Sequence, residues 1–212
     1  MLYDHYYVSI TVYPKLACLF VSLFIFSGCV SSESDYMSTD STINEPEDEF
    51  QGINIVASTL GRDVDKSNTF DILNESEGSS TLLIWVSTGC RGCHLWTEMI
   101  RECFDNGTIS EEANVVTVHR YPNFENFEDV NQTYGNNSSQ FYTPWPVLTP
   151  QNDAVAWDAI SGTATNIPLT SAFNNPSTPT LQILNSDGKI IWQSKTYNPD
   201  YQVIEEILEE II

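Results

Sequence analysis

The feature that most constrains this chain is a pair of cysteines at the junction between a buried strand and an amphipathic helix. The segment 81–104 reads TLLIWVSTGCRGCHLWTEMIRECF. Its first part, 82–86, is a short apolar run rich in β-branched and aromatic residues, which is typical of a buried strand. Apolar residues then recur at helical spacing up to the helix-ending pair Asn106–Gly107. Cys90 therefore lies where the strand turns into the helix, and Cys93 lies one turn further along.

A cysteine at the start of a helix has unusual chemistry. Unpaired backbone N–H groups and the positive end of the helix dipole favour its thiolate, which is the nucleophile of disulfide exchange. Two cysteines three residues apart can also close a small disulfide, so that one attacks a partner and the other resolves the mixed intermediate. We expect Cys90, the more exposed and nearer the dipole, to attack and Cys93 to resolve. Arg91 adds a positive charge beside the attacking sulfur.

The order of strand, Cys90-Arg91-Gly92-Cys93 and helix resembles the thioredoxin-like superfamily. Within it, the closest similarity is to the membrane-tethered extracytoplasmic thiol–disulfide oxidoreductases of the cytochrome c maturation type. The resemblance covers about Gly52 to the C-terminus and implies an α/β fold. This fold has a central mixed β-sheet flanked by helices, an N-terminal hairpin and an insertion before a strand led by a cis-proline. The resemblance also implies a redox-active Cys90–Cys93 disulfide, with no separate cofactor and no metal.

The remaining apolar patterns fit this order. A hairpin is expected from 53–58 and 69–73, and a second core strand at 114–119. Apolar residues at helical spacing between Phe124 and Tyr134 predict a short helix, which completes a parallel β-α-β unit. The C-terminal part predicts two strands, 180–184 and 189–193, around a tight turn, and then a helix that begins at 198–200 and buries an aliphatic stripe.

The insertion, 121–177, has weaker patterns. Several prolines predict mostly loop over 136–150, with a brief strand at Val147–Leu148. A helix is expected at 153–160 and another loop at 161–176. Two interpretations of this region stay open, because an insertion can shape partner choice or can be a surface excursion without a role.

Thr178 and Pro179 immediately precede the predicted C-terminal hairpin. In the superfamily that the chain resembles, a proline here is cis and packs against the Cys-x-x-Cys turn, and the residue before it offers backbone hydrogen bonds to the bound partner. The resemblance therefore implies that Thr178 and Pro179 bind substrate. The alternative is an ordinary trans proline at the start of a strand.

The expected proton relay is altered in this sequence. Many members of the superfamily carry a buried acid or amide six residues before the first cysteine, and Ile84 occupies that position here. His94, next to Cys93, and His119, at the end of the neighbouring strand, are the candidate replacements. Cys103 lies about 15 Å beyond Cys93 along the helix at standard rise, so it is expected to be a buried hydrophobe rather than a third redox centre.

The first 49 residues carry an export pattern. Residues 16–26 form an unbroken apolar run that is too short to span a bilayer but suits a signal peptide. The following FSGC resembles a lipoprotein cleavage site, with lipidation at Cys29. We therefore expect a signal peptide at 1–28, an acidic flexible tether at 29–49 and a thioredoxin-like domain at 50–212. An ordinary cleaved signal or an uncleaved anchor are the alternatives, and all three place the domain outside the cytoplasm.

The charge and the cysteine content limit the classes of molecule that the protein can bind. The 212 residues carry a net charge of −21 with only eight Lys and Arg, so nucleic acid is excluded as a partner. Removal of the signal and lipidation of Cys29 would leave three of the five cysteines, too few for a disulfide framework. The expected partners are exported proteins with thiols or disulfides, a membrane electron donor or acceptor, and the membrane itself through the lipid anchor.

Two rival interpretations use the same motif. Cys90 to His94 also match the pattern for covalent attachment of c-type haem, with His94 as one axial ligand. The strand-rich sequence downstream disfavours a small cytochrome c, which is mostly helical. A copper-binding module could use Cys90, Cys93 and a histidine, because thiolate and imidazole suit Cu(I). A peroxidase of the peroxiredoxin type shares the fold, although its active cysteine lies in a different local context.

Overall fold

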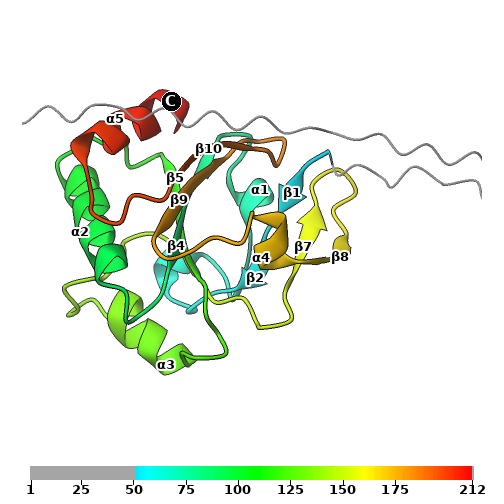
Figure 1. Ribbon diagram of the computed structural model, residues 1–212, viewed down its shortest axis with the longest axis horizontal. Coiled ribbons are helices and arrows are strands. Elements are labelled where there is room, and N and C mark those ends of the chain that lie inside the picture. Colours follow the sequence, from blue (N-terminus) through cyan, green and yellow to red (C-terminus); the bar gives the residue numbers. More distant parts are fainter. Residues whose placement is uncertain (1–50, 212) are drawn as a thin grey trace, which may run out of the picture. The chain divides into compact units, whose positions relative to one another are not determined.

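The computed structural model describes residues 51–211 (Figure 1). The predicted signal peptide, the lipidation site Cys29 and the acidic tether lie outside these residues. None of the helices described within this range is long and apolar enough to cross a membrane.

A five-stranded mixed sheet forms the centre of the domain, in the order β10-β9-β4-β5-β6. Strand β4 pairs in parallel with β5 and antiparallel with β9, and the edge strands β6 and β10 complete the sheet. This arrangement confirms the predicted α/β class with a mixed central sheet. The strand bounds are Thr81–Val86 for β4, Asn114–His119 for β5, Val147–Leu148 for β6, Thr180–Leu184 for β9 and Ile190–Ser194 for β10.

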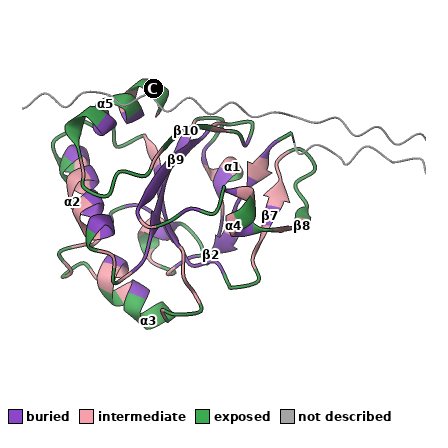
Figure 2. Cartoon of the chain, in the orientation of Figure 1, coloured by how far each residue is buried: buried purple, intermediate pink, exposed green. Residues whose placement is uncertain are grey.

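Every residue of β4 is buried, because both faces of the sheet are covered (Figure 2). Side chains of a strand alternate between faces. Leu82, Ile84 and Val86 therefore join one hydrophobic cluster, while Leu83 and Trp85 join another. A strand buried on both sides reads as a continuous apolar run, which is why the sequence pattern identified it.

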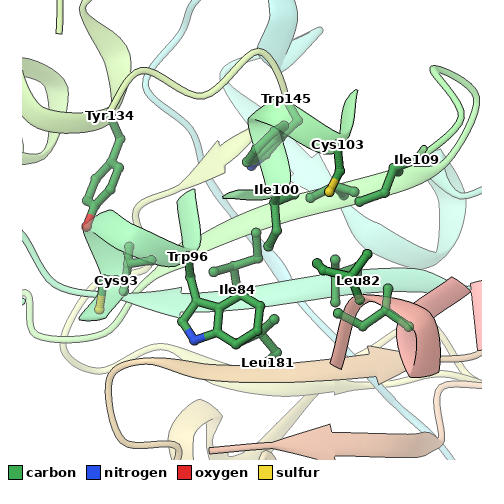
Figure 3. Packing of buried hydrophobic residues seen from close by; sticks show 14 of the residues in the cluster. Leu82, Ile84, Cys93, Trp96, Ile100, Cys103, Ile109, Tyr134, Trp145 and Leu181 are labelled. Carbon is green, nitrogen blue, oxygen red and sulfur yellow. The ribbon is translucent and has the colours of Figure 1, made fainter. Parts of the chain in front are cut away.

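Two long helices cover the first face (Figure 1). Helix α2 (Arg91–Asp105) and helix α5 (Tyr201–Ile211) present their apolar stripes to the sheet. Figure 3 shows the stripe of α2 with Trp96, Ile100 and Cys103 above β4. Both helices confirm the predicted elements. Their long, regular stripes made them readable from the sequence alone.

Short elements cover the second face. Strands β2 (Val56–Ser58) and β3 (Thr69–Asp71) form the predicted antiparallel hairpin. Their side chains meet Trp85 and Phe173 in the second cluster. Around the hairpin lie the short elements η1 (Asp63–Asp65), α1 (Ile72–Glu75) and α4 (Leu169–Ala172), and a three-stranded sheet of β1 (Ile53–Asn54), β7 (Val155–Asp158) and β8 (Ala164–Pro168).

Two predictions for the insertion are wrong. Residues 153–160 do not form a helix, because 155–158 are strand β7, which is hydrogen-bonded to β1 on one side and β8 on the other. The loop expected at 161–176 contains β8 and α4. One backbone partner of β7, strand β1, comes from a segment about a hundred residues earlier, and such long-range pairing overrides a weak local preference. The brief strand predicted at Val147–Leu148 is confirmed as β6.

The predicted helix between the second and third core strands is present but starts later than its apolar pattern. Asn126 caps α3 (Phe127–Val130) through a capping box with Asp129, and a π-helical turn, η2 (Asn131–Gly135), continues it. Val130 and Tyr134 reach the core as expected. Phe124 lies before the helix and is 86% exposed, so it does not belong to the buried stripe.

Candidate redox site

Cys90 and Cys93 are joined by a disulfide at the start of α2. Cys90 is the N-cap residue, and its sulfur accepts a hydrogen bond from the backbone N–H of Cys93 at 3.1 Å. The Cys90 side chain is half-buried, whereas Cys93 has no exposed surface. The two sulfurs are therefore unequal in the way the sequence predicted. A partner can reach Cys90, while Cys93 lies against the core.

The residue before Cys93 has a steric role that the sequence pattern did not indicate. A Cβ on Gly92 would lie 2.6 Å from the carbonyl oxygen of Tyr197 and 2.9 Å from its ring. The loop between β10 and α5 approaches this turn closely, and the indole N–H of Trp96 donates to the carbonyl oxygen of Thr196 at 2.7 Å. Glycine is thus the residue that lets this loop pack on the first turn of α2.

The peptide bond between Thr178 and Pro179 is cis, the conformation that the resemblance implies. Pro179 is buried at the start of β9 and Thr178 is half-buried. The hydroxyl oxygens of Thr178 and Ser87 are 3.4 Å apart, so this loop contacts the turn that leads to Cys90. The role of these two residues in binding a partner stays a prediction.

His119 reaches the same turn through a residue that the sequence analysis missed. Its Nε2 lies 2.8 Å from a carboxylate oxygen of Glu125. That carboxylate accepts hydrogen bonds from the backbone N–H of Thr88 at 2.9 and 3.0 Å and from that of Gly89 at 3.4 Å. The signal that could have found Glu125 is its place just beyond the carboxyl end of a parallel strand, where such sheets build their sites.

The environment of this pair shifts both pKa values downward. Burial lowers the pKa of His119 against the opposing pull of Glu125. For Glu125, burial alone raises the pKa, but hydrogen bonds from Thr88, His119 and Gly89 outweigh burial and bring the pKa below its usual value. At neutral pH the pair is therefore a neutral imidazole donating to a carboxylate.

His94 contacts the other side of Thr88. Its Nε2 lies 2.8 Å from the Thr88 carbonyl oxygen, and its ring stacks on Phe141 with centroids 3.9 Å apart. Within residues 51–211, the hydrogen bonds of His94 and His119 thus lead to the turn before Cys90 and not to either sulfur. The relay role predicted for these histidines is not tested by this geometry.

The position of the missing acid is apolar in structure as well as in sequence. Ile84 is fully buried and packs in the same cluster as Cys93 and Trp96 (Figure 3). The hydroxyl of Tyr134 donates to the Ser87 carbonyl oxygen at 2.9 Å. Burial raises the pKa of this phenol far above its usual range, and the charge of Glu125 raises it further, so Tyr134 stays protonated.

Cys103 is a free thiol in the core, as predicted. Burial raises the pKa of its thiol, and the charge of Glu102 adds to this effect. Figure 3 shows it well along α2 from Cys93. In the part of the chain that the structure describes, no group of three or more His, Cys, Asp and Glu side chains is arranged to hold a metal ion. Haem attachment would require both bonded sulfurs to separate and His94 to leave its stack.

Comparison with known proteins identifies the fold. No protein-family model matches the sequence, and no curated protein is significantly similar to it. A thiol:disulfide interchange protein of the thioredoxin family from Chlorobium tepidum superposes with a TM-score of 0.51 at 13% identity, covering 76% of this chain and 94% of that one. A candidate thioredoxin from Neisseria meningitidis gives a TM-score of 0.50 at 18% identity, covering 76% and 89%.

A third structure, the C-terminal domain of a candidate thiol-disulfide oxidoreductase from Bacteroides thetaiotaomicron, gives a TM-score of 0.50 at 10% identity, covering 77% of this chain and 96% of that domain. Residues 51–211 thus have a thioredoxin-like fold, which confirms the predicted fold class. The disulfide lies at the junction between its central strand and its first long helix.

Proposed function

We propose that this protein is an extracytoplasmic thiol–disulfide oxidoreductase that exchanges disulfides with exported proteins through Cys90 and Cys93. One observation carries the proposal: a disulfide joins a reachable N-cap cysteine to a buried cysteine within a thioredoxin-like fold. A structural disulfide has no need of this asymmetry. An exchange catalyst needs it, because the first sulfur must meet the partner and the second must be kept for resolution.

The exchange follows from these two positions. In the reduced protein, the Cys90 thiolate attacks one sulfur of a partner disulfide, and the other partner sulfur leaves as a thiolate that takes up a proton. The new bond is a mixed disulfide. Cys93 then loses its proton and attacks the Cys90 sulfur, which closes the disulfide and releases the second partner thiol. Two electrons pass from the protein to the partner, and the reverse sequence oxidises a partner dithiol.

The surroundings of Cys90 support this chemistry. The sulfur caps α2, where the N–H of Cys93 and the helix dipole favour a thiolate. Thr178 and Pro179 border the turn that leads to the sulfur. We assign to their backbone the binding of an extended partner segment, so that the partner's sulfur is presented to Cys90.

The location of this activity rests on the N-terminal sequence. A short apolar run followed by FSGC supports export and lipidation at Cys29, and seven acidic residues with no basic one between 30 and 49 support a solvated tether. A domain on such a tether would meet exported proteins near the membrane. A membrane electron donor or acceptor would return the Cys90–Cys93 pair to its starting state.

The test uses the full chain and three variants. Purified protein is equilibrated with glutathione buffers, and its intact mass and its ability to reduce insulin are measured. We expect the wild type to gain two hydrogens on reduction and to reduce insulin. Cys90→Ser should abolish both, Cys93→Ser should accumulate mixed disulfides, and the control Cys103→Ala should match the wild type. A haem absorption band after expression in a host that attaches haem, with added mass on Cys90 and Cys93, would overturn the proposal.

A further inference from the structure

The turn between β4 and α2 is held from outside its own chain segment. The carboxylate of Glu125 accepts the N–H groups of Thr88 and Gly89, the two residues immediately before Cys90. His119 fixes the carboxylate in turn, because its Nε2 lies 2.8 Å from it. A partly buried carboxylate with several donors is a strong acceptor, since charge-assisted hydrogen bonds are shorter and stronger than neutral ones.

This carboxylate also brings a negative charge close to the nucleophile. Gly89 is bonded to Cys90, and the Glu125 side chain is only 16% exposed, so water screens its charge weakly. A negative charge near a thiol disfavours the thiolate. The helix N-terminus acts in the opposite direction, so the site balances two effects on one sulfur.

The other titratable or charged groups around the pair do not cancel this charge at neutral pH. His119 is neutral there, and Tyr134 keeps its proton. Arg120 is directed elsewhere, because its Nε donates to the carbonyl oxygen of Pro176 and its guanidinium lies over Tyr121. The remaining groups facing this turn are His94, on the Thr88 carbonyl oxygen, and Arg91, whose side chain is exposed, so that water screens its charge more than that of Glu125.

A small cavity adjoins His119 on the side of the insertion. It has a volume of about 90 Å³ and is bordered by Trp85, Arg120, Pro150 and Leu169. A cavity of this size with polar groups on its wall can hold water. Residues of the insertion therefore line the space beside the imidazole that holds Glu125.

We propose that Glu125, held by His119, is a positioning residue of the redox site that fixes the Thr88–Gly89 turn and restrains formation of the Cys90 thiolate. This inference rests on the proposed exchange function and gives it a direction. A less stable thiolate makes the reduced protein less stable relative to its disulfide. Glu125 thereby biases the protein toward giving electrons to its partners, as a reductase does.

The test compares Glu125→Gln with Glu128→Gln, an exposed carboxylate on α3, three residues away. The amide is isosteric and keeps one oxygen for the Thr88 N–H, but it removes the charge. We measure the rate of Cys90 alkylation by iodoacetamide against pH in the reduced full chain, and the equilibrium with glutathione. Glu125→Ala removes the same charge and serves as the second variant if the first does not fold.

Glu125→Gln should raise the alkylation rate at pH 6 about fivefold and shift the glutathione equilibrium toward the dithiol, whereas Glu128→Gln should change neither. A variant with reduced thermal stability but an unchanged pH profile would reduce Glu125 to a structural role and overturn the inference. Slower alkylation would overturn it as well. If the wild type itself fails to exchange with glutathione or insulin, the proposed function is wrong. That outcome is distinct from a failure of the Glu125 inference, which needs an active wild type and an unchanged Glu125→Gln.

Discussion

The two faces of the central sheet are built on different plans. One face is covered by two long helices, α2 and α5, whose regular apolar stripes form a single cluster with β4. The other is covered by short pieces drawn from the N-terminal segment and the insertion. The helical face carries the disulfide, since Cys90 caps the N-terminus of α2 and Cys93 lies in its first turn. Among the described residues, the cluster on the other face contains no cysteine, yet it buries Trp85 and Phe173 as completely as the helical face buries Trp96.

The difference shows how a face without long elements is held together. Buried polar bonds join strands of the central sheet to one another and to the covering segment at Phe173. Gln182 on β9 accepts from the Trp85 indole N–H at 2.7 Å and donates to the Phe173 carbonyl oxygen at 3.1 Å and to Gln193. Each of these groups would be costly to bury without a partner. On the helical face, the apolar stripes of α2 and α5 form a large part of the cluster, and single buried bonds such as that from the Trp145 indole N–H to the Thr117 hydroxyl oxygen at 2.9 Å are added to them.

The largest expected effect comes from removing a buried side chain from the face covered by short segments. Phe173→Ala removes a fully buried ring that packs at a tilt against Trp85, with centroids 5.5 Å apart, so we expect a loss of about 3–5 kcal/mol in the free energy of unfolding. Phe124→Ala is the matched control, because that ring is 86% exposed and should change stability by less than about 0.5 kcal/mol. Urea denaturation measures both. Equal, small effects would mean that the insertion is not part of the core.

The next test addresses the margin of the helical face. Gly92→Ala forces a methyl group into the Tyr197 carbonyl oxygen, and we expect about 1–3 kcal/mol of destabilisation from overpacking. Gly89→Ala is the control, because a Cβ there meets nothing within 4 Å and the backbone has no positive φ. Thermal unfolding of the oxidised proteins distinguishes them. If Gly92→Ala unfolds at the same temperature as the wild type, the loop between β10 and α5 can move away from the added methyl group at little cost.

Acid should lower the free energy of unfolding by disrupting the His119–Glu125 pair that holds the turn between β4 and α2. The folded-state pKa values of His119 and Glu125 both lie below their ordinary values of 6.5 and 4.5. A lowered pKa means that the unfolded chain binds the proton more readily than the folded chain. Each group therefore contributes its whole stabilisation above its ordinary pKa and loses it as the pH is lowered. We expect a first loss below about pH 6.5 and a second below about pH 4.5. His119→Gln should remove only the first, as measured by urea denaturation at each pH.

The smallest expected effect is a gain. Thr97 is completely buried on α2, and among the described residues its hydroxyl has no hydrogen-bond partner. Thr97→Val has the same shape without the buried hydroxyl, so we expect stabilisation of about 1 kcal/mol. Ser76→Ala is a useful contrast, because that hydroxyl donates to the Leu73 carbonyl oxygen at 3.0 Å and its loss should destabilise. Destabilisation of Thr97→Val, measured by thermal unfolding, would reveal a bond that the oxidised structure does not contain.

The sequence predicted the helical face far better than the other. Strand β4, helix α2, the β9–β10 hairpin and helix α5 each carry a pattern long enough to read locally. The insertion does not, because β7 and β8 are short and derive their order from each other and from β1. No window within 153–176 contains the information that Ile53 pairs with Asp158.

The site divides in a similar way. The sequence located Cys90 and Cys93 and implied the cis peptide before Pro179, since a motif and a chain order mark them. It singled out His94 and His119 but not what they contact. Glu125 has no motif around it, and only the folded chain brings it to Thr88. The need for glycine at position 92 was also hidden, because it depends on a loop more than a hundred residues later.

The pairing of β4 has a consequence for how the chain is made. Its parallel partner β5 is complete at residue 119, but its antiparallel partner β9 ends at residue 184. The intervening stretch of about 65 residues takes roughly 3–13 s to synthesise at ordinary rates. During that interval one edge of β4 is unpaired, and the cover that buries Cys103 is incomplete. The central strand therefore completes its pairing late, and the sheet that supports the Cys90–Cys93 turn assembles only after residue 184 has been made.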